Sequence, residues 1–367
     1  MSVADLALQR SKYKHLSDDE WRWFLQQVEG RERTADKLPT FAAMEDWWYP
    51  VRLSCEQCSS ELAAKYKASL VSGETMVDLT GGYGVDTYFI SEGFSHTDYV
   101  EQNAELCRIA THNFAHKPIT IHNSTAEEFL KTAGQYDLIF LDPARRDSHG
   151  GKVFRLEDCT PNVVELLPTL QAHGKRLMFK LSPMLDLTQA VTSLSQVCWD
   201  IFVVAIKNEV KEVLLLSGGT GQITAIDLDK EDQAFVFTKE EEQNCQMVNG
   251  KCENGKWLYE PNAAILKSGA YKLVAQRFGL HKLDVNTHLY GSDTLIEPFP
   301  GRVWRITEKQ DLKQANVLCR NYPLTPEQLK KKLHLKDGGT AYVIGCRVAG
   351  KPTLFFAERI EDIHSKS

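Results

Sequence analysis

The stretch from Met76 to Asp86 limits what this chain can fold into more than any other part of the sequence. An apolar run that ends at Leu79 predicts a buried strand, and Thr80-Gly81-Gly82-Tyr83-Gly84 follows it. A helix is expected from Asp86 onward, so the glycines occupy a tight turn before a helix N-terminus. Glycine lets the backbone bend and lets a ligand approach without meeting a Cβ atom. The stretch therefore predicts a binding site for a nucleotide-like ligand.

The spacing of this turn is D-x-T-G-G-x-G, which differs from the G-x-G-x-x-G of the dinucleotide fingerprint. It resembles motif I of the Rossmann-like, class I S-adenosylmethionine (SAM) methyltransferases. The resemblance implies that SAM is the cofactor and that motif I residues surround it, namely Asp78, Thr80, Gly81, Gly82 and Gly84.

Two polar strand ends follow in the order that this family shows. Glu101 ends a predicted strand, and an acid there in Rossmann-type folds accepts hydrogen bonds from ribose hydroxyls. Asn123 and Ser124 end the next predicted strand, where class I methyltransferases often place a polar residue near adenine. We therefore expect Glu101, Asn123 and Ser124 to contact the cofactor.

A third strand, Tyr136–Leu141, leads into Asp142-Pro143-Ala144-Arg145-Arg146, which resembles motif IV, the catalytic loop of the family. Enzymes that methylate amino groups of nucleobases often have Asn/Asp-Pro-Pro-Tyr/Phe there, so that oxygens bind the target amine and the aromatic ring stacks on the base. This chain has Ala144 and Arg145 instead, which puts base stacking by the loop in doubt. Arginine can stack on a base or bind a phosphate.

From these residues we expect a catalytic group formed by Asp142, Pro143, Arg145 and Lys180, the last of which follows an apolar strand toward the same crevice. Arg145 and Arg146 are expected to bind an anionic substrate. Asp-Pro-x-Arg is also similar to the RNA uracil-C5 methyltransferases, which need a cysteine nucleophile after the next strand. The matching segment, Phe179–Pro183, has no cysteine, and this favours methylation of nitrogen or oxygen.

The order of apolar and helical segments predicts an α/β fold with a doubly wound, Rossmann-like sheet. Residues 201–207 and 213–217 are expected to form its final strand pair. A helical region should precede the sheet, with a capping box at Ser17-Asp18-Asp19-Glu20. Residues 231–256 are expected to form an exposed hairpin or linker, and 261–278 one helix closed by Gly279. A small α+β region should end the chain, with a β-α-β unit over residues 314–346.

Over nearly its whole length the chain is similar to a bacterial family of class I methyltransferases with a THUMP-like C-terminal domain. The resemblance in this region rests on Tyr259–Ala264 and Ala315–Leu324, besides motif IV. It implies four parts: a helical region (1–72), a methyltransferase domain (73–256), a ferredoxin-like segment (257–301) and a THUMP-like domain (302–367). THUMP domains proper bind structured RNA, so RNA is the implied partner.

The charge distribution agrees with a polyanionic partner for the C-terminal region. The chain has a net charge of −6, yet residues 256–367 hold 18 Lys and Arg against 11 Asp and Glu. A basic tail on an acidic body favours contact with RNA. Two other functions stay open: methylation of a small molecule or protein, and RNA binding without catalysis. An intact motif I with Glu101 argues against the non-catalytic alternative.

Other features narrow the class of protein. No apolar run is long enough for a membrane helix, and the N-terminus lacks the pattern of a secretory signal, so we expect a cytoplasmic protein. The nine scattered cysteines suit reduced thiols. Cys55 and Cys58 form a C-x-x-C pair without a matching second pair, so we expect no metal site there. The sequence does not predict an oligomeric state.

Overall fold

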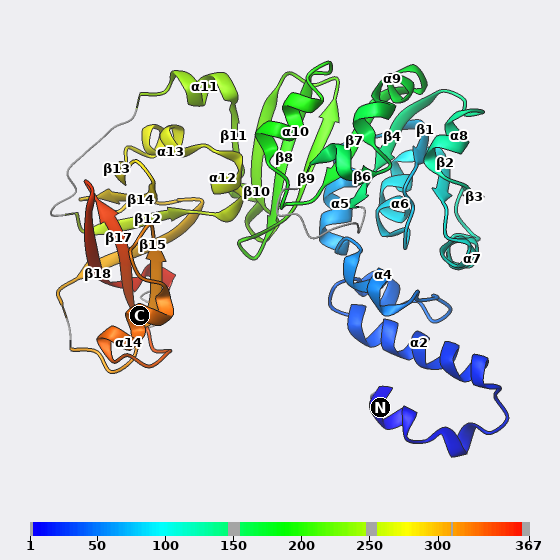
Figure 1. Ribbon diagram of the computed structural model, residues 1–367, viewed down its shortest axis with the longest axis horizontal. Helices are drawn as coiled ribbons and strands as arrows, with labels where there is room; N and C mark the ends of the chain where they lie inside the picture. The colour runs from blue at the N-terminus through cyan, green and yellow to red at the C-terminus, as the bar shows by residue number, and fades with distance from the viewer. Residues whose placement is uncertain (1–2, 146–154, 247–254, 310, 362–367) are drawn as a thin grey trace. The chain divides into compact units, whose positions relative to one another are not determined.

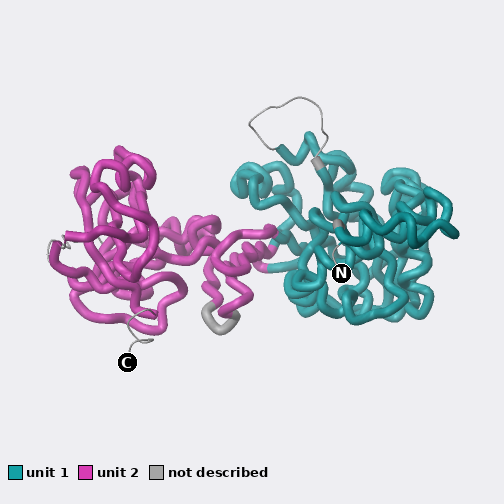
Figure 2. Tube along the Cα trace, turned by 90° about the horizontal axis from the view of Figure 1, so that it is seen from below, with its two compact units in different colours: residues 1–199, 214–219 teal, residues 200–213, 220–367 magenta. Residues whose placement is uncertain are grey.

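The computed structural model describes residues 3–145, 155–246, 255–309 and 311–361. The chain forms two compact units, which Figure 2 distinguishes by colour. The first contains residues 1–199 and 214–219, and the second contains residues 200–213 and 220–367. The division of the chain into four domains stays a prediction.

Helices form the N-terminal part of the first unit, as the sequence predicts. They are α1 (Val3–Ala7), the 3-10 helix η1 (Arg10–Tyr13), α2 (Asp18–Thr34), α3 (Pro39–Ala42), α4 (Arg52–Gln57) and α5 (Glu61–Ser69). The predicted capping box is present, because the Ser17 side chain accepts from the Glu20 backbone and the Glu20 side chain accepts from the Ser17 backbone.

A nine-stranded sheet follows, in the order β11-β10-β8-β9-β7-β4-β1-β2-β3. Neighbouring pairs among β7, β4, β1, β2 and β3 are parallel, as a doubly wound sheet requires (Figure 1). The predicted Rossmann-like fold is therefore confirmed. The elements up to β7 are β1 (Gly73–Asp78), α6 (Val85–Ile90), η2 (Ser91–Gly93), β2 (Phe94–Glu101), α7 (Ala104–Asn113), β3 (Ile119–Asn123), α8 (Ala126–Leu130), β4 (Tyr136–Leu141), β5 (Ala144–Arg145), η3 (Leu156–Asp158), β6 (Cys159–Thr160), α9 (Val163–His173) and β7 (Gly174–Leu181).

The sheet continues through α10 (Leu187–Ser193), β8 (Trp199–Ile206), β9 (Glu209–Ser217), β10 (Gln222–Asp227), η4 (Leu228–Gln233) and β11 (Phe235–Thr238). β8 and β9 are neighbours in the sheet, which confirms that the two predicted strands pair, but they are not its final pair, because β10 and β11 follow them in the same sheet. The prediction of an exposed hairpin or linker over residues 231–256 misses two elements, and residues 247–254 lie outside the described residues. β11 pairs with β10 in an antiparallel ladder, and α11 (Lys239–Asn244) begins with a second capping box at Thr238.

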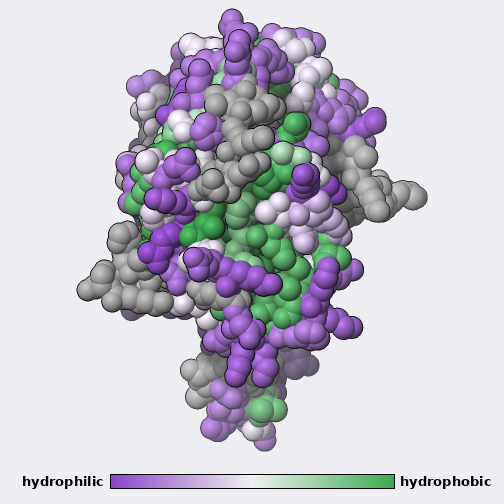
Figure 3. All heavy atoms as spheres, turned by 90° about the vertical axis from the view of Figure 1, so that its left-hand side faces the viewer, coloured by the Kyte–Doolittle hydropathy of each residue, from purple (hydrophilic) through white to green (hydrophobic). Residues whose placement is uncertain are grey.

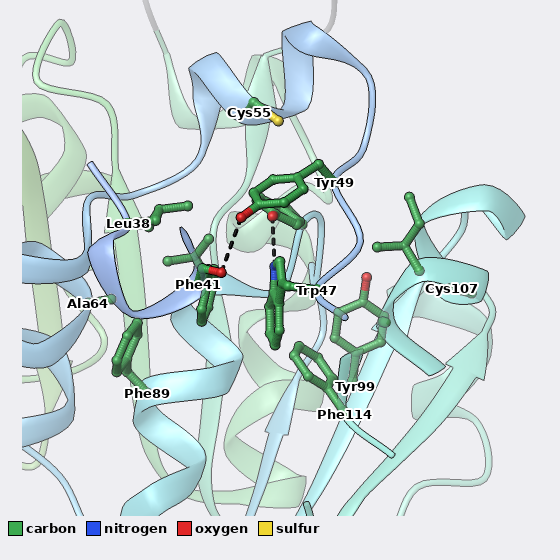
Figure 4. Packing of buried hydrophobic residues seen from close by; sticks show 14 residues of the cluster. Leu38, Phe41, Trp47, Tyr49, Cys55, Ala64, Phe89, Tyr99, Cys107 and Phe114 are labelled. Atoms are coloured by element: carbon green, nitrogen blue, oxygen red, sulfur yellow. Dashed lines mark hydrogen bonds between the residues drawn. The ribbon is translucent and has the colours of Figure 1, made fainter. Parts of the chain in front are cut away.

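An aromatic cluster joins the N-terminal helices to the sheet. Phe41 stacks on Trp47 with ring centroids 3.9 Å apart, and the Trp47 indole N–H donates to the Tyr83 hydroxyl at 2.8 Å (Figure 4). The Tyr49 hydroxyl donates to the Phe41 carbonyl at 3.1 Å. Aromatic rings of this size bury a large apolar area and fix orientation through their polar tips. Phe41, Trp47 and Tyr49 thus belong to the core, and Phe41 packs against Tyr88 and Phe89 of the helix that follows the glycine turn.

The second unit contains a seven-stranded sheet in the order β13-β14-β12-β15-β18-β17-β16. Its elements are β12 (Trp257–Pro261), α12 (Ala263–Ser268), α13 (Tyr271–Phe278), β13 (His281–Asp284), β14 (Thr287–Ser292), β15 (Gly301–Thr307), β16 (Asn316–Arg320), α14 (Pro326–Leu333), β17 (Ala341–Val348) and β18 (Lys351–Arg359). Figure 3 shows the face of the molecule that lies on the left in Figure 1, where β17 and β18 are. This face is mostly hydrophilic and surrounds a hydrophobic area.

Two predictions for this unit have different outcomes. The β-α-β unit is confirmed, since β16 and β17 pair in parallel and α14 begins at Pro326 after the Thr325 cap. The single helix over residues 261–278 is wrong. Gly269 adopts a left-handed conformation, with φ of +85°, and separates α12 from α13. Gly279 ends α13 as expected.

Among the described residues, no helix has the combination of length and apolar character needed to cross a membrane.

The contact between α2 and the aromatic cluster can be tested at Gly30. A Cβ atom there would lie 2.3 Å from the Cβ atom of buried Tyr49. We expect Gly30→Ala to lower the free energy of unfolding by about 1–3 kcal/mol through overpacking. Gly134→Ala is the matched control, because a Cβ atom there meets no heavy atom within 4 Å, and its effect should stay within about 0.5 kcal/mol. Equal denaturant midpoints for the two variants would contradict this packing.

Candidate active site

A cavity of about 430 Å³ lies at the ends of the parallel strands in the first unit. This is where open α/β sheets bind ligands. The lining comes from the turn after β1, the ends of β2 and β4, Lys180 on β7, and the segment around α4. The predicted residues that the structure brings together around this cavity are Asp78, Thr80, Gly81, Gly82, Gly84, Glu101, Ser124, Asp142 and Lys180.

The three glycines of the turn serve different purposes. A Cβ atom on Gly81 would lie 2.1 Å from the Tyr99 ring, and one on Gly84 would lie 2.5 Å from the Phe114 ring. These two glycines are required by packing beneath the turn. Gly82 has φ of +56°, and the atom nearest to a Cβ there is the Thr80 carbonyl at 3.7 Å. Gly82 is therefore the position where a missing side chain leaves room for a ligand.

Asp78 and Thr80 connect the ends of two strands. The Asp78 carboxylate accepts from the Thr80 backbone N–H at 2.9 Å and from the Thr87 hydroxyl at 2.6 Å. The Thr80 hydroxyl accepts from the Asp142 backbone N–H at 2.6 Å, so the turn after β1 is tied directly to the loop after β4. Burial raises the pKa of Asp78 to about 7, although the hydrogen bonds from Thr87 and Thr80 oppose the rise.

The end of β2 presents Glu101 to the cavity. Its carboxylate accepts from the backbone N–H groups of Gly82 at 2.9 Å and Asn103 at 2.7 Å. Ser124 lines the cavity, whereas Asn123 is not among the described lining residues. The Asn123 amide donates to the carbonyls of Glu101 and Gln102, at 2.9 and 3.0 Å, and thereby holds the end of β3 against the end of β2.

Four charged side chains form a chain of ion pairs at the cavity wall, and three of them, Asp86, Asp142 and Lys180, line the cavity. Asp86, in the first turn of α6, pairs with Lys67 of α5 at 3.2 Å and with Lys180 at 3.2 Å. Lys180 also pairs closely with Asp142. Lys67 is fully buried, and Asp86 and Lys180 are nearly so. Lys180 thus lies between two carboxylates and holds the Asp142 side chain at the cavity wall.

The charge state of Asp86 follows from these neighbours. Burial alone would raise the pKa of its carboxyl group, but the ammonium groups of Lys67 and Lys180 and the hydroxyl of Ser59 lower it to about 2. Asp86 is therefore ionised at neutral pH. Neither Asp86 nor Lys67 was predicted to be a site residue. The one available signal was an acid directly after the glycine turn, and a helix N-terminus explains that equally well.

Among the described residues that remain in the predicted catalytic loop, the structure places only one at the cavity. Ala144 lines the cavity, and Pro143 is not in the described lining. The Arg145 backbone pairs with Cys159 in the short ladder of β5 and β6, but its side chain lies outside the described part of the chain. Arg146 also lies outside the described residues. The predicted substrate-binding pair Arg145–Arg146 therefore stays a prediction.

Part of the cavity lining comes from residues that were not predicted to belong to the site. Ser54 and Gln57 of α4 contribute to it, together with Cys58, Thr160 and Pro161. Burial raises the pKa of the Cys58 thiol above its ordinary value, which keeps it protonated and weakly nucleophilic. Helix α4 escaped notice because nothing in the sequence of Arg52–Gln57 distinguishes a cavity wall from an ordinary surface helix.

Several known proteins and protein families are similar to this chain. Residues 257–300 match the model of a ferredoxin-like domain, and residues 301–359 match the model of a THUMP domain-like family. Two curated relatives from Mycobacterium tuberculosis, strains CDC 1551 / Oshkosh and ATCC 25618 / H37Rv, are 22% identical to this chain. Both are described as uncharacterized S-adenosylmethionine-dependent methyltransferases. In each case the match covers 89% of this chain and 92% of the relative.

A crystal structure from Porphyromonas gingivalis W83, described as a presumed methyltransferase, is more similar. It is 32% identical, and the match covers 94% of this chain and 92% of that chain with a TM-score of 0.84. The sequence and fold thus agree over nearly the whole length of both proteins. The chain belongs to the family of SAM-dependent methyltransferases that carry ferredoxin-like and THUMP-like C-terminal domains.

Proposed function

We propose that this protein transfers a methyl group from SAM to a nitrogen or oxygen atom of an RNA, either tRNA or rRNA. The proposal that the protein is a methyltransferase is supported most directly by a hydrogen bond between two loops of the site. The Thr80 hydroxyl joins the glycine turn to Asp142, so a cofactor on the turn and an acceptor at Asp142 share one cavity.

The residues of the cavity fit SAM on three counts. Gly82 leaves open space at a left-handed backbone position, Glu101 offers a carboxylate at the end of β2, and a volume of about 430 Å³ lies within the usual range for small-molecule sites. Glu101 would hold the ribose hydroxyls, Ser124 would lie near adenine, and Asp78 would stabilise the cationic end of the cofactor. Bound SAM supplies a methyl group made electrophilic by its sulfonium.

The acceptor half of the site needs only to orient a nucleophile and manage one proton. The Asp142 carboxylate can accept a hydrogen bond from an N–H or O–H group of the acceptor. Its ion pair with Lys180 limits its rotation, since Lys180 is itself held by Asp86. Lys180 is in this view a positioning residue for Asp142. Pro143 and Arg145 stay candidates for the same group, and Arg145 with Arg146 for the anionic part of the substrate.

Two observations support RNA as the substrate. Residues 256–367 carry an excess of Lys and Arg, and residues 301–359 match the THUMP-like model. Lysines are concentrated at the end of α14, where Lys330, Lys331 and Lys332 form its last turn. We also propose that the boundaries between the four domains lie at residues 72, 256 and 301.

The first prediction from the proposed function concerns Gly82 in the glycine turn. Gly82→Asn keeps a residue type that tolerates positive φ but places a side chain in the cavity. We expect it to weaken SAM binding at least about tenfold, measured by isothermal titration, with little change in melting temperature. Gly81→Ala should instead lower the melting temperature, because its Cβ would collide with Tyr99. Unchanged affinity in Gly82→Asn would remove the turn from the binding site.

The second prediction follows from the raised pKa of Asp78. Since this pKa is about 7 in the folded protein, Asp78 is mostly neutral at pH 6 and ionised at pH 8. Ionisation as the pH rises destabilises the free protein, and a cation bound nearby offsets that cost. SAM affinity should therefore rise between pH 6 and pH 8 and then level off. Titrations of Asp78→Asn should lack this rise; a flat profile in the wild-type protein would contradict the assignment.

The third prediction tests the reaction itself. Incubation with SAM tritiated on its methyl group, followed by separation of tRNA, rRNA, protein and small molecules, should place the label in an RNA fraction. Asp142→Asn should bind SAM but transfer at least about a hundredfold less label, because the acceptor loses its carboxylate partner. Label confined to protein or small molecules would replace the RNA proposal with the alternative substrates. Absence of SAM binding would contradict the enzymatic proposal as a whole.

A further inference from the structure

Two motifs of the C-terminal region have no part in the methyl transfer described above, and the structure brings them together. Glu260 lies in β12, within the motif Tyr259–Ala264, and Arg320 ends β16, within the motif Ala315–Leu324. The Arg320 Nε group donates to the Glu260 carboxylate at 2.5 Å. The two residues are sixty positions apart in the sequence, so the contact joins distant segments of this unit.

A second arginine approaches the same carboxylate. Glu260 and Arg302 are direct partners in the antiparallel ladder of β12 and β15, and Arg302 Nη1 lies 3.7 Å from Glu260 Oε2. Next to Arg320, the Asn321 amide donates to the Thr287 hydroxyl of β14 at 3.3 Å. These contacts hold the end of β16 against β12 and β14. In the strand order, however, β16 is an edge strand, and three strands lie between it and β12.

Burial in this cluster is uneven. The Glu260 side chain is 5% exposed, whereas those of Arg302 and Arg320 are 32% and 39% exposed. The carboxylate is therefore hidden behind two guanidinium groups that reach solvent. The cluster carries two positive charges and one negative charge. Besides Glu260, Arg320 donates from Nη1 to the Cys319 carbonyl at 3.0 Å, and in the described part of the chain its Nη2 group has no acceptor.

Arg305, which lies on β15 as Arg302 does, forms an ordinary surface ion pair. It pairs one-to-one with Glu358 at 2.9 Å, and both side chains are partly exposed, at 49% and 31%. Such a pair is electrically balanced and contributes little to stability. The Glu260 cluster differs because one buried carboxylate orients two guanidinium groups and leaves a net positive charge at the surface.

We propose that Glu260 holds Arg302 and Arg320 as a two-arginine clamp for phosphodiester groups of RNA. The planar fork of arginine matches the oxygens of a phosphate, and a guanidinium already held in place loses less conformational entropy when it binds. This inference rests on the proposed RNA substrate and assigns a binding site to it. The clamp positions RNA and has no part in SAM binding.

The test is a fluorescence anisotropy titration of the full-length protein with labelled bulk tRNA and labelled rRNA fragments at several salt concentrations. Arg302→Gln/Arg320→Gln should weaken binding by about tenfold or more for every RNA that the wild-type protein binds, and should make binding less dependent on salt. Arg305→Gln removes the same kind of charge from the same strand and should change affinity less than about twofold.

A further variant protects the test against misfolding, because loss of Arg320 leaves a buried carboxylate with a weaker partner. Arg320→Lys keeps the charge beside Glu260 but removes the fork, and it should weaken RNA binding while SAM affinity and melting temperature stay near wild type. Equal losses for Arg305→Gln and the double variant, or wild-type affinity in Arg320→Lys and the double variant, would overturn the clamp alone. A wild-type protein that binds no RNA would overturn both the clamp and the proposed substrate.

Discussion

The pairing of Asp86 with Lys67 and Lys180 is the interaction on which the rest of the site depends. A carboxylate buried by itself would cost several kcal/mol, and a buried ammonium would cost a similar amount. Each becomes tolerable only because the other is present, so α5, α6 and β7 must meet in one arrangement. That arrangement brings Lys180 to Asp142, and Asp142 is tied through Thr80 to the glycine turn. The position of the loop after β4 thus follows from the balance of charges among these side chains.

The same logic explains why motif I contains more glycine than ligand binding needs. Two of its three glycines allow aromatic rings from β2 and from the segment after α7 to pack under the turn. The rings support the turn from below, and Gly82 leaves space above it. A glycine-rich loop is often regarded as flexible, yet here the glycines permit close packing that holds the loop in place.

Much of the fold could be predicted from the sequence. The strand run at Met76–Leu79, the cap at Ser17 and the β-α-β unit around Pro326 each carry a local pattern strong enough to identify the element. The errors arose where local patterns were ambiguous. Gly269 splits a continuous helical pattern, and β11 has only four residues in a polar segment. For the site, the sequence pointed to residues at strand ends, because the parallel sheet gathers them. It could not indicate Lys67, Asp86 or the wall from α4, since their roles arise only from packing between distant segments.

The wall formed by Ser54, Gln57 and Cys58 has a consequence for how the substrate preference of this protein can change. In many α/β enzymes the sheet is a complete catalytic module, and appended helices can be exchanged without disturbing it. Here the helices before β1 provide both a wall of the cavity and the counter-ion of Asp86. They and the sheet must therefore evolve together, and a change of substrate is more easily reached by altering side chains on α4 than by exchanging the N-terminal region.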